Sequence, residues 1–279
     1  MNLERIKEFQ DVVLGYYTQD GRHELPWRVV GLDDTVNPYH VLVSEIMLQQ
    51  TQVPRVLPKF GSFIAQFPTV QALAAAPLGE VLQAWSGLGY NRRAKFLWQA
   101  AQVVVAQYGG QLPRTSAELV ALPGIGANTA GAVLAYAYNM PVVFIETNIR
   151  TVFIHHFFSD QTSVHDKDIA DMVARTLPED ARTWYWALMD YGTHLKQTVG
   201  NLSVHSKHYT KQSAFHGSRR QVRGQVLKLL GAGPASRQQL AQSIIDERLS
   251  EVLDALVAER MIRKAGASYS LYGFDNAAV

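Results

Sequence analysis

The sequence of 279 residues contains no cysteine. The chain therefore cannot form disulfide bonds, bind zinc through thiolates or hold an iron–sulfur cluster by cysteine ligands. Its first ten residues also lack the apolar core of a signal peptide. Both absences are typical of a cytoplasmic protein.

Charged residues are absent from the segment 119–145, which is long enough to span a membrane. Helix-breaking and polar residues interrupt this segment, namely Pro123, Gly124, Gly126, Asn128, Asn139 and Pro141. We therefore predict the buried centre of a globular helical fold, with no membrane contact.

Acidic residues are absent between Asp190 and Asp246, although lysine, arginine and histidine are frequent there. The net charge of the chain is only +2, so the distribution of charge is more informative than the total. A long stretch of one sign suits a polyanion such as a phosphate backbone, and a solvated linker is the alternative. The residues predicted to contact phosphate here are Lys207, Lys211, Arg219 and Arg220.

Alternation typical of β-strands is absent before residue 260, and apolar residues recur instead at helical spacing. Proline and glycine punctuate the helices that this spacing predicts. The predicted helices are residues 3–17, 39–52, 53–66, 69–76, 78–85, 91–108, 116–122, 128–138, 148–158, 166–176 and 181–194.

The C-terminal residues follow a different pattern. Helices are predicted at 221–230, 236–245 and 249–259, followed by short strands at 261–264 and 268–272 around Gly266. Three helices and a β-hairpin are the order of a winged-helix module, and a helical dimerisation or capping domain is the alternative. The predicted domains are 1–196, a basic linker at 197–219, and a winged-helix-like module at 220–279.

The segment Leu122–Ala130 predicts a loop between two helices that binds an anion. Pro123 ends the first helix, and Gly124 and Gly126 allow positive φ and a close approach of the backbone. The second helix begins at about Ala127, where free N–H groups and the helix dipole favour negative charge. The Gly-Lys-Ser/Thr ending of a nucleotide loop is absent. This pattern favours DNA phosphate over an ordinary helix corner, with contacts from Gly124, Gly126, Ala127 and Thr129.

With its flanking segments, this hairpin resembles the helix-hairpin-helix DNA glycosylase superfamily, and the wider chain is similar to its MutY branch. The resemblance covers about residues 20–195. It rests on the hairpin and on four further segments in the same order: Leu25-Pro26-Trp27-Arg28, Ser44–Val53, Gly87-Leu88-Gly89-Tyr90 and Ile145-Glu146-Thr147-Asn148.

The resemblance implies an all-α fold of two lobes with the active site in the cleft between them. The partner would be double-stranded DNA containing a damaged or mismatched base, which is flipped out of the stack before its glycosidic bond is cut. The protein would be a monomer associated with the nucleoid. We expect no cofactor, although relatives bind a monovalent cation through hairpin carbonyls, here those of Val120, Leu122 and Ile125.

Two glutamates are the candidate catalytic groups. Glu45 lies on an apolar helix, where desolvation should raise its pKa and suit it to a general acid. By resemblance, it protonates the leaving purine. Glu146 opens a helix, which should keep it ionised beside a positively charged sugar. The family has aspartate at this position, and Asn148 matches a residue that supports the catalytic carboxylate.

Further residues match the family's contacts to the base and its partner. Tyr90 resembles a wedge that intercalates beside the lesion, and a core tyrosine is the alternative. The three residues after it that carry positive charge, Arg92, Arg93 and Lys95, would touch phosphate or form a solvated helix face. The predicted base contacts are Trp27, Arg28, Gln49, Gln50, Thr51 and Asn128, although Trp27 could equally be plain core.

Asn128 stands where strand-cleaving relatives carry a nucleophilic lysine. An amide cannot form a Schiff base, so we predict a monofunctional glycosylase with little or no strand cleavage. The base expected from the resemblance is adenine opposite 8-oxoguanine or guanine. The missing cluster, Glu146 and the different C-terminal module leave two alternatives: another base, such as thymine or uracil, or a DNA-structure binding protein without catalysis.

Overall fold

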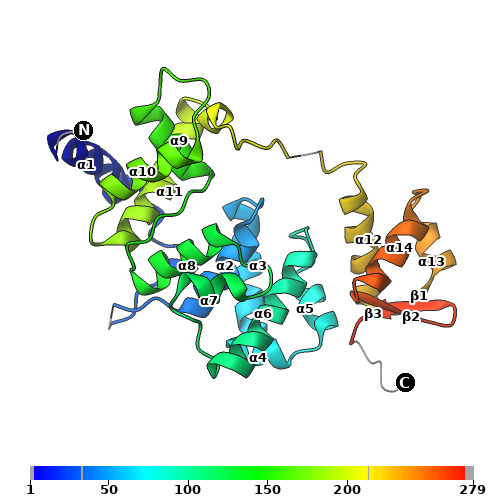
Figure 1. Ribbon diagram of the computed structural model, residues 1–279. Coiled ribbons are helices and arrows are strands. Elements are labelled where there is room, and N and C mark those ends of the chain that lie inside the picture. The colour runs from blue at the N-terminus through cyan, green and yellow to red at the C-terminus, as the bar shows by residue number, and fades with distance from the viewer. Residues whose placement is uncertain (1–2, 33, 213, 274–279) are drawn as a thin grey trace. The chain divides into compact units, whose positions relative to one another are not determined.

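The computed structural model describes residues 3–32, 34–212 and 214–273, and it is mostly helical (Figure 1). It divides into two compact units, each built from separate stretches of chain. Unit 1 comprises residues 1–45, 114–121 and 125–211, and unit 2 comprises 46–113, 122–124 and 212–279. The domain boundaries expected from the sequence, at 196 and 219, stay a prediction.

Unit 1 is organised around the long helix α11 (Ala181–Thr198), which packs against three others. These are α1 (Leu3–Asp20), α8 (Ala127–Tyr138) and α9 (Thr147–Phe157). Aromatic side chains fill the space between them, since the Phe9 ring meets Phe153 and Trp184 edge to face, with centroids 5.3 and 5.5 Å apart. The unit also contains α7 (Ser116–Ala121), α10 (Asp166–Thr176), most of α2 (Pro38–Leu48) and the 3-10 turns η1 (Pro26–Arg28) and η2 (Leu202–His205).

Unit 2 begins with four helices: α3 (Val53–Gln66), α4 (Val70–Ala75), α5 (Leu78–Ala84) and α6 (Arg92–Tyr108). Helix α6 contacts both α4 and α5, and Trp85 and Phe63 are fully buried beside them. The chain returns to this unit near its C-terminus, where α12 (Arg219–Ala232) packs against α5.

The C-terminal residues form a winged-helix-like module, as predicted. Helix α12 is followed by β1 (Ala235–Ser236), α13 (Arg237–Ser243), α14 (Leu249–Ala258), β2 (Ile262–Ala265) and β3 (Ser268–Leu271), with antiparallel strand order β1-β3-β2. Strand β1 was not predicted, because two residues cannot show an alternating pattern. The fold class predicted from the sequence, a helical glycosylase fold with a small α+β module, is confirmed.

Helix boundaries follow local capping. The bounds of α3 and α10 agree with the prediction, whereas α11 continues four residues beyond the predicted His194. Asp180 and Ser218 cap α11 and α12 by accepting hydrogen bonds from backbone N–H groups of the first turn. Among the described residues, no helix combines the length and apolar character needed to cross a bilayer.

Candidate active site

Glu45 lies on α2, where the neighbouring residues 41–44 and 46–47 are all buried. Its own side chain is only partly exposed. Burial, reinforced by the negative charge of Glu146, raises the pKa of Glu45 to about 8, and the positive charge of Arg28 only partly opposes this. Glu45 is therefore mostly protonated near neutral pH, as the sequence analysis expected of a general acid.

Glu146 is the N-cap of α9, and its Oε1 accepts hydrogen bonds from the backbone N–H groups of Asn148 and Ile149, the latter at 3.1 Å. Burial raises the pKa of Glu146, although Lys196, these N–H groups and Arg150 act in the opposite direction. The helix N-terminus by itself favours ionisation, but desolvation has the larger effect on this pKa. Ionisation of Glu146 beside the sugar stays a prediction.

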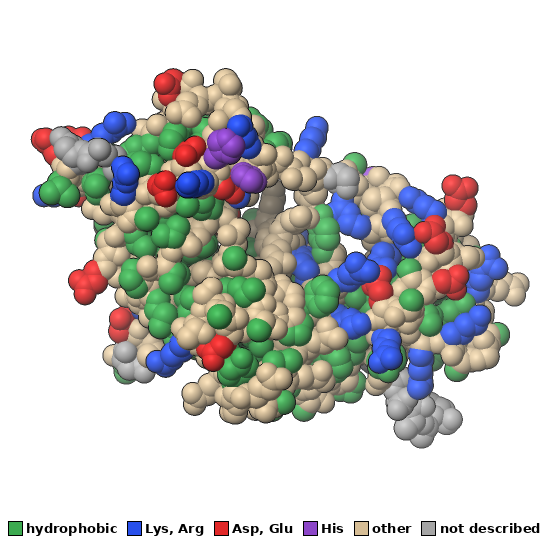
Figure 2. Space-filling view, in the orientation of Figure 1, with side chains coloured by type: hydrophobic (Ala, Val, Ile, Leu, Met, Phe, Trp, Pro, Cys, Tyr) green, Lys and Arg blue, Asp and Glu red, His purple; other side chains and the backbone are tan. Residues whose placement is uncertain are grey.

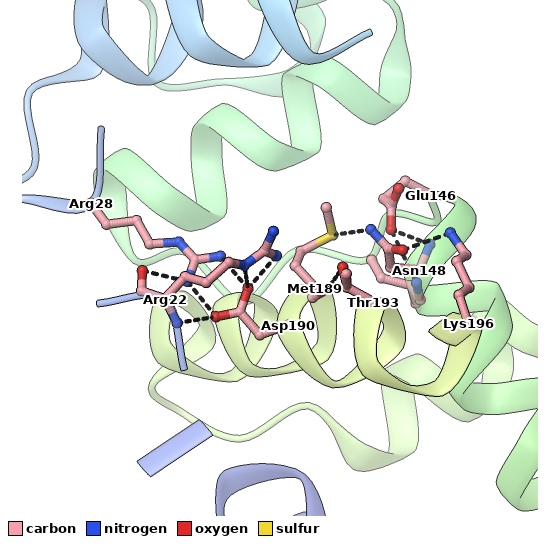
Figure 3. Close-up of polar contacts among 9 residues, drawn as sticks. Arg22, Arg28, Glu146, Asn148, Met189, Asp190, Thr193 and Lys196 are labelled. Atoms are coloured by element: carbon pink, nitrogen blue, oxygen red, sulfur yellow. Dashed lines mark hydrogen bonds and ion pairs between the residues drawn. The ribbon is translucent and has the colours of Figure 1, made fainter. Parts of the chain in front are cut away.

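The side chain of Asn148 is held by helix α11 (Figure 3). Its Oδ1 accepts a hydrogen bond from Lys196 Nζ at 2.6 Å, and its Nδ2 contacts the Met189 sulfur at 3.8 Å. Helix α11 can approach Asn148 closely because residue 192 is a glycine. A Cβ at this position would lie only 2.6 Å from the Asn148 carbonyl oxygen. Asn148, Lys196 and the Glu146 carboxyl thus form one connected group, which we call the carboxyl support.

Lys196 supplies the positive charge of the carboxyl support, and replacing it should change the pH dependence of activity. In Lys196→Met the pKa of Glu146 should rise, because the cation that lowers it is lost. A reaction that needs ionised Glu146 is lost as pH falls through this pKa. The acidic limb of the pH–rate profile should therefore move to higher pH in Lys196→Met and stay near its wild-type position in Lys196→Arg. Identical acidic limbs in wild type and Lys196→Met would contradict this role.

Arg28 forms an ion pair with Asp190, which lies on α11 on the N-terminal side of Lys196 (Figure 3). Its two terminal nitrogens donate to the Asp190 carboxylate at 2.8 and 2.9 Å, and Arg22 donates to the same carboxylate through its backbone N–H at 2.7 Å. Burial alone would raise the pKa of Asp190, but the bonds and charges of Arg28 and Arg22 outweigh it and lower the pKa. Arg28 thus anchors the segment before α2 to α11, and a direct contact with the base stays a prediction.

Breaking this buried pair should destabilise the fold. Asp190→Asn removes the charge that compensates buried Arg28, and loss of one partner of such a pair costs about 3 to 5 kcal/mol. Urea unfolding should show this decrease in the free energy of unfolding. Glu251→Gln, which removes one partner of the exposed pair with Arg219, is the matched control and should unfold like the wild type. An Asp190→Asn protein as stable as the control would refute the anchoring role.

Tyr136 on α8 was not identified from the sequence. Its ring is 5% exposed and stacks near Trp186, with centroids 6.2 Å apart. Burial raises its pKa well above the usual 10, and the charges of Glu45 and Glu146 raise it further. A neutral phenol close to both carboxyl groups can donate a hydrogen bond. Tyr136 gave no sequence signal, because a tyrosine on an apolar helix follows the same pattern when it belongs to the core. Trp27 is also buried, at 6% exposure.

The predicted hairpin lies between α7 and α8, and α8 begins at Ala127 as expected. Gly124 has φ +74°, and a Cβ there would lie 2.5 Å from the Phe96 Cβ, so glycine is required. The same expectation for Gly126 was wrong. It has φ −90° with open space around it, and it serves as the N-cap of α8. Asn128 is exposed in the first turn of α8. The cation site at the carbonyls of Val120, Leu122 and Ile125 stays a prediction.

The predicted base-contacting loops of unit 2 share an uncommon backbone conformation. Gln50 and Tyr90 have φ values of +53° and +47°, in the left-handed region that side chains rarely adopt. Arg93 holds both loops, since it donates to the carbonyls of Ile46 and Met47 at 2.8 and 3.0 Å, to Gln49 and Gly89, and to Thr51 Oγ1.

Arg93 is 8% exposed, so the expectation that it touches phosphate or faces solvent was wrong. Its neighbours on α6 are also engaged within unit 2. Arg92 pairs with Glu259 at 2.8 Å, and Lys95 donates to the Glu259 carbonyl. The sequence did not indicate Glu259 as a partner of Arg92 or Lys95, because it lies 167 and 164 positions away along the chain.

The basic stretch after α11 is partly fixed to unit 1. The backbone of Val164 bonds to His205 and Lys207 at 2.8 and 3.0 Å, and the Lys207 side chain contacts His165. Asp166 binds Arg150 through two hydrogen bonds of 2.8 and 2.6 Å. Lys211 is exposed at the end of this unit, while Arg219 and Arg220 belong to unit 2. Phosphate contacts by these residues stay predictions.

Comparison with known proteins gives a consistent result. Residues 43–177, which include Glu45, the hairpin and Glu146, match the family model described as "HhH-GPD superfamily base excision DNA repair protein". An adenine DNA glycosylase of Mycolicibacterium smegmatis is 36% identical over 94% of this chain and 95% of its own length. One from Buchnera aphidicola is 37% identical over 61% of this chain, a match that spans 46% of that relative.

Solved structures agree with the fold. A thermostable thymine-DNA glycosylase has a TM-score of 0.58 and 25% identity, covering 68% of this chain and 86% of that one. A non-covalent complex of endonuclease III with DNA has a TM-score of 0.52 at 21% identity, covering 70% and 86%. The second likeness concerns the fold alone.

Proposed function

The chain belongs to the HhH-GPD superfamily of base excision DNA repair proteins, and we propose that it is a monofunctional DNA glycosylase that removes adenine from a mismatch. The observation that carries this proposal is the pair of interacting carboxyl groups. Glu45 is kept mostly protonated, and Glu146 is held on a helix N-terminus with a cation in its support. Two carboxyl groups in different environments suit the acid and the electrostatic partner of glycosidic cleavage.

The reaction follows from these two roles. The bond between the base nitrogen and the sugar carbon breaks, and its electron pair stays on the base. The Glu45 proton passes to a ring nitrogen of the leaving base. The positive charge that develops on the sugar is stabilised by ionised Glu146. A water oxygen then adds to the sugar carbon, and its proton passes to a carboxylate.

The substrate is double-stranded DNA containing the target nucleotide. The hairpin, with its required glycine at Gly124 and the helix start at Ala127, is suited to bind the backbone phosphate. Asn128, exposed beside it, cannot form a Schiff base, which supports hydrolysis without strand cleavage. A cysteine-ligated iron–sulfur cluster cannot be bound, because the chain has no cysteine.

A panel of duplexes tests the proposal. Each duplex contains one adenine opposite 8-oxoguanine or guanine, one thymine opposite guanine, or one uracil, and the products are separated with and without alkali. We expect strand breaks at adenine only, and only after alkali. Cleavage confined to thymine would instead favour thymine as the target base, as in the name of the structurally similar thymine-DNA glycosylase. Tight binding without any abasic site would contradict the enzyme itself, and breaks without alkali would contradict the role of Asn128.

A further inference from the structure

The ring of Tyr90 lies close to two guanidinium groups of unit 2. Arg93, from the helix that follows, is 5.3 Å from the ring centroid, and Arg220, from α12, is 4.6 Å away. A cation over an aromatic face is attracted to it, and the planar guanidinium is especially suited to stacking. The Tyr90 side chain is therefore fixed by a nearby arginine and by a second one that lies 130 positions away in the sequence.

The hydroxyl of Tyr90 is also engaged by the C-terminal part of the chain. It accepts hydrogen bonds from Arg220 and from Gln212 Nε2, and the same Gln212 nitrogen lies 3.5 Å from Gln50 Oε1. Gln50 and Tyr90 are the two loop residues with left-handed backbones. Gln212, in the linker before the module, thus contacts both loops that were predicted to meet the lesion, and Arg220, at the start of the module, contacts the Tyr90 loop.

The module is joined to the rest of unit 2 next to Tyr90. Glu259, after α14, accepts hydrogen bonds from Arg92 at 2.8 Å and from Arg223 at 2.6 and 3.1 Å. Burial alone would raise the pKa of Glu259, but these arginines outweigh it and lower the pKa. Arg92 begins the helix that follows Tyr90, so this connection fixes the module at the same loop.

The third helix of the module is unsuited to reading a DNA groove. In helix-turn-helix proteins the recognition helix lies in the major groove, between the phosphate backbones. Here α14 carries exposed Glu251 and Asp254 and no lysine or arginine. Figure 2 shows many lysine and arginine side chains over the module, with a few acidic side chains among them. The contacts to Tyr90 therefore indicate a role other than groove binding by α14.

We propose that Arg220 is a positioning residue for Tyr90, through which the C-terminal module controls insertion of this side chain beside the flipped nucleotide. The inference rests on the proposed function, because it assumes that Tyr90 meets DNA. Tyr90 has a strained backbone, and such a conformation persists only where surrounding contacts hold it. Arg220 supplies a stacking surface and a hydrogen bond together, which lysine cannot reproduce. Arg220 thus acts on the Tyr90 side chain rather than on phosphate.

Single-turnover kinetics on the duplex with adenine opposite 8-oxoguanine tests the proposal. Arg220→Ala should lower the excision rate about tenfold, which corresponds to roughly 1.4 kcal/mol, and leave the Kd for this duplex nearly unchanged. Lys228→Ala removes the same charge from an exposed position of the same helix and should leave both unchanged. In a Tyr90→Leu background, Arg220→Ala should have no further effect, because the side chain that it positions is gone.

Three results would overturn the proposal. The first is an unchanged rate in Arg220→Ala. The second is a Kd raised equally for damaged and undamaged duplexes with a weaker salt dependence, which would make Arg220 a phosphate contact. The third is independent effects of the Tyr90 and Arg220 substitutions.

Failure of the proposed function would be recognised separately, by a wild-type protein that excises no base. Fluorotyrosine at position 90 would then still report on the contact by fluorine NMR without DNA. Its resonance should shift in Arg220→Ala and not in Lys228→Ala. An unshifted resonance in Arg220→Ala would refute the contact itself.

Discussion

Glu45→Gln should lower the single-turnover rate of adenine excision by about a thousandfold, within the range that a general acid supplies. Glutamine has nearly the same shape but no proton to give to the leaving base. Binding to the duplex, measured by fluorescence anisotropy, should stay close to that of the wild type. Glu8→Gln, which changes an exposed glutamate on α1, is the matched control and should keep full activity. Excision by Glu45→Gln at the wild-type rate would remove Glu45 from the mechanism.

Although Glu45→Gln should lower the excision rate, it should raise the free energy of unfolding at high pH. The pKa of Glu45 is raised on folding to about 8, so its folded environment favours the protonated form. The contribution of Glu45 to the free energy of unfolding is therefore highest at pH values below its pKa in the unfolded chain. It is lost as pH rises through the pKa of Glu45 in the folded protein. Glutamine stays neutral, so Glu45→Gln should resist urea better than the wild type at pH above 8 and similarly at low pH. A group kept at a cost to stability is typical of a functional site.

Glu146→Gln should also abolish most excision, by about a hundredfold to a thousandfold, because an electrostatic partner of the charged sugar is lost. The amide oxygen can still accept the hydrogen bonds from the N–H groups of Asn148 and Ile149. Stability should therefore change little in Glu146→Gln, whereas Glu146→Ala should lose the cap as well, at a cost of about 1 kcal/mol.

This pair of variants separates catalysis from capping. Excision rates should fall in both, and urea unfolding should shift only in the alanine variant. Glu146→Asp keeps the charge and restores the residue found in the family, so it should retain far more activity than Glu146→Gln. If Glu146→Gln retains full activity, the carboxylate is only a helix cap.

Features determined locally along the chain were predictable from the sequence. Apolar spacing gave the helices, and the glycine and proline positions gave the hairpin before α8. The raised pKa of Glu45 followed from its apolar neighbours on α2, because a carboxyl on such a helix loses its water wherever the helix packs.

Long-range contacts were not predictable in the same way. The carboxyl support depends on Lys196, which is 48 residues from Asn148 in the sequence. The pair of Arg28 with Asp190 spans 162 residues. Neither pairing leaves a local pattern, since a lysine or an arginine near a helix end looks the same with or without a buried partner. The raised pKa of Glu146 was not predictable for the same reason, because its burial is produced by the tertiary structure.

The most direct test of the account is the pH dependence of single-turnover adenine excision at saturating protein. With Glu45 as the general acid, the rate should be high near neutral pH and fall as pH rises through about 8, where the carboxyl loses its proton. In Glu45→Gln the remaining slow rate should show no such fall. A wild-type rate that stays constant through pH 9, or an identical fall in Glu45→Gln, would contradict the assignment of Glu45 as the acid.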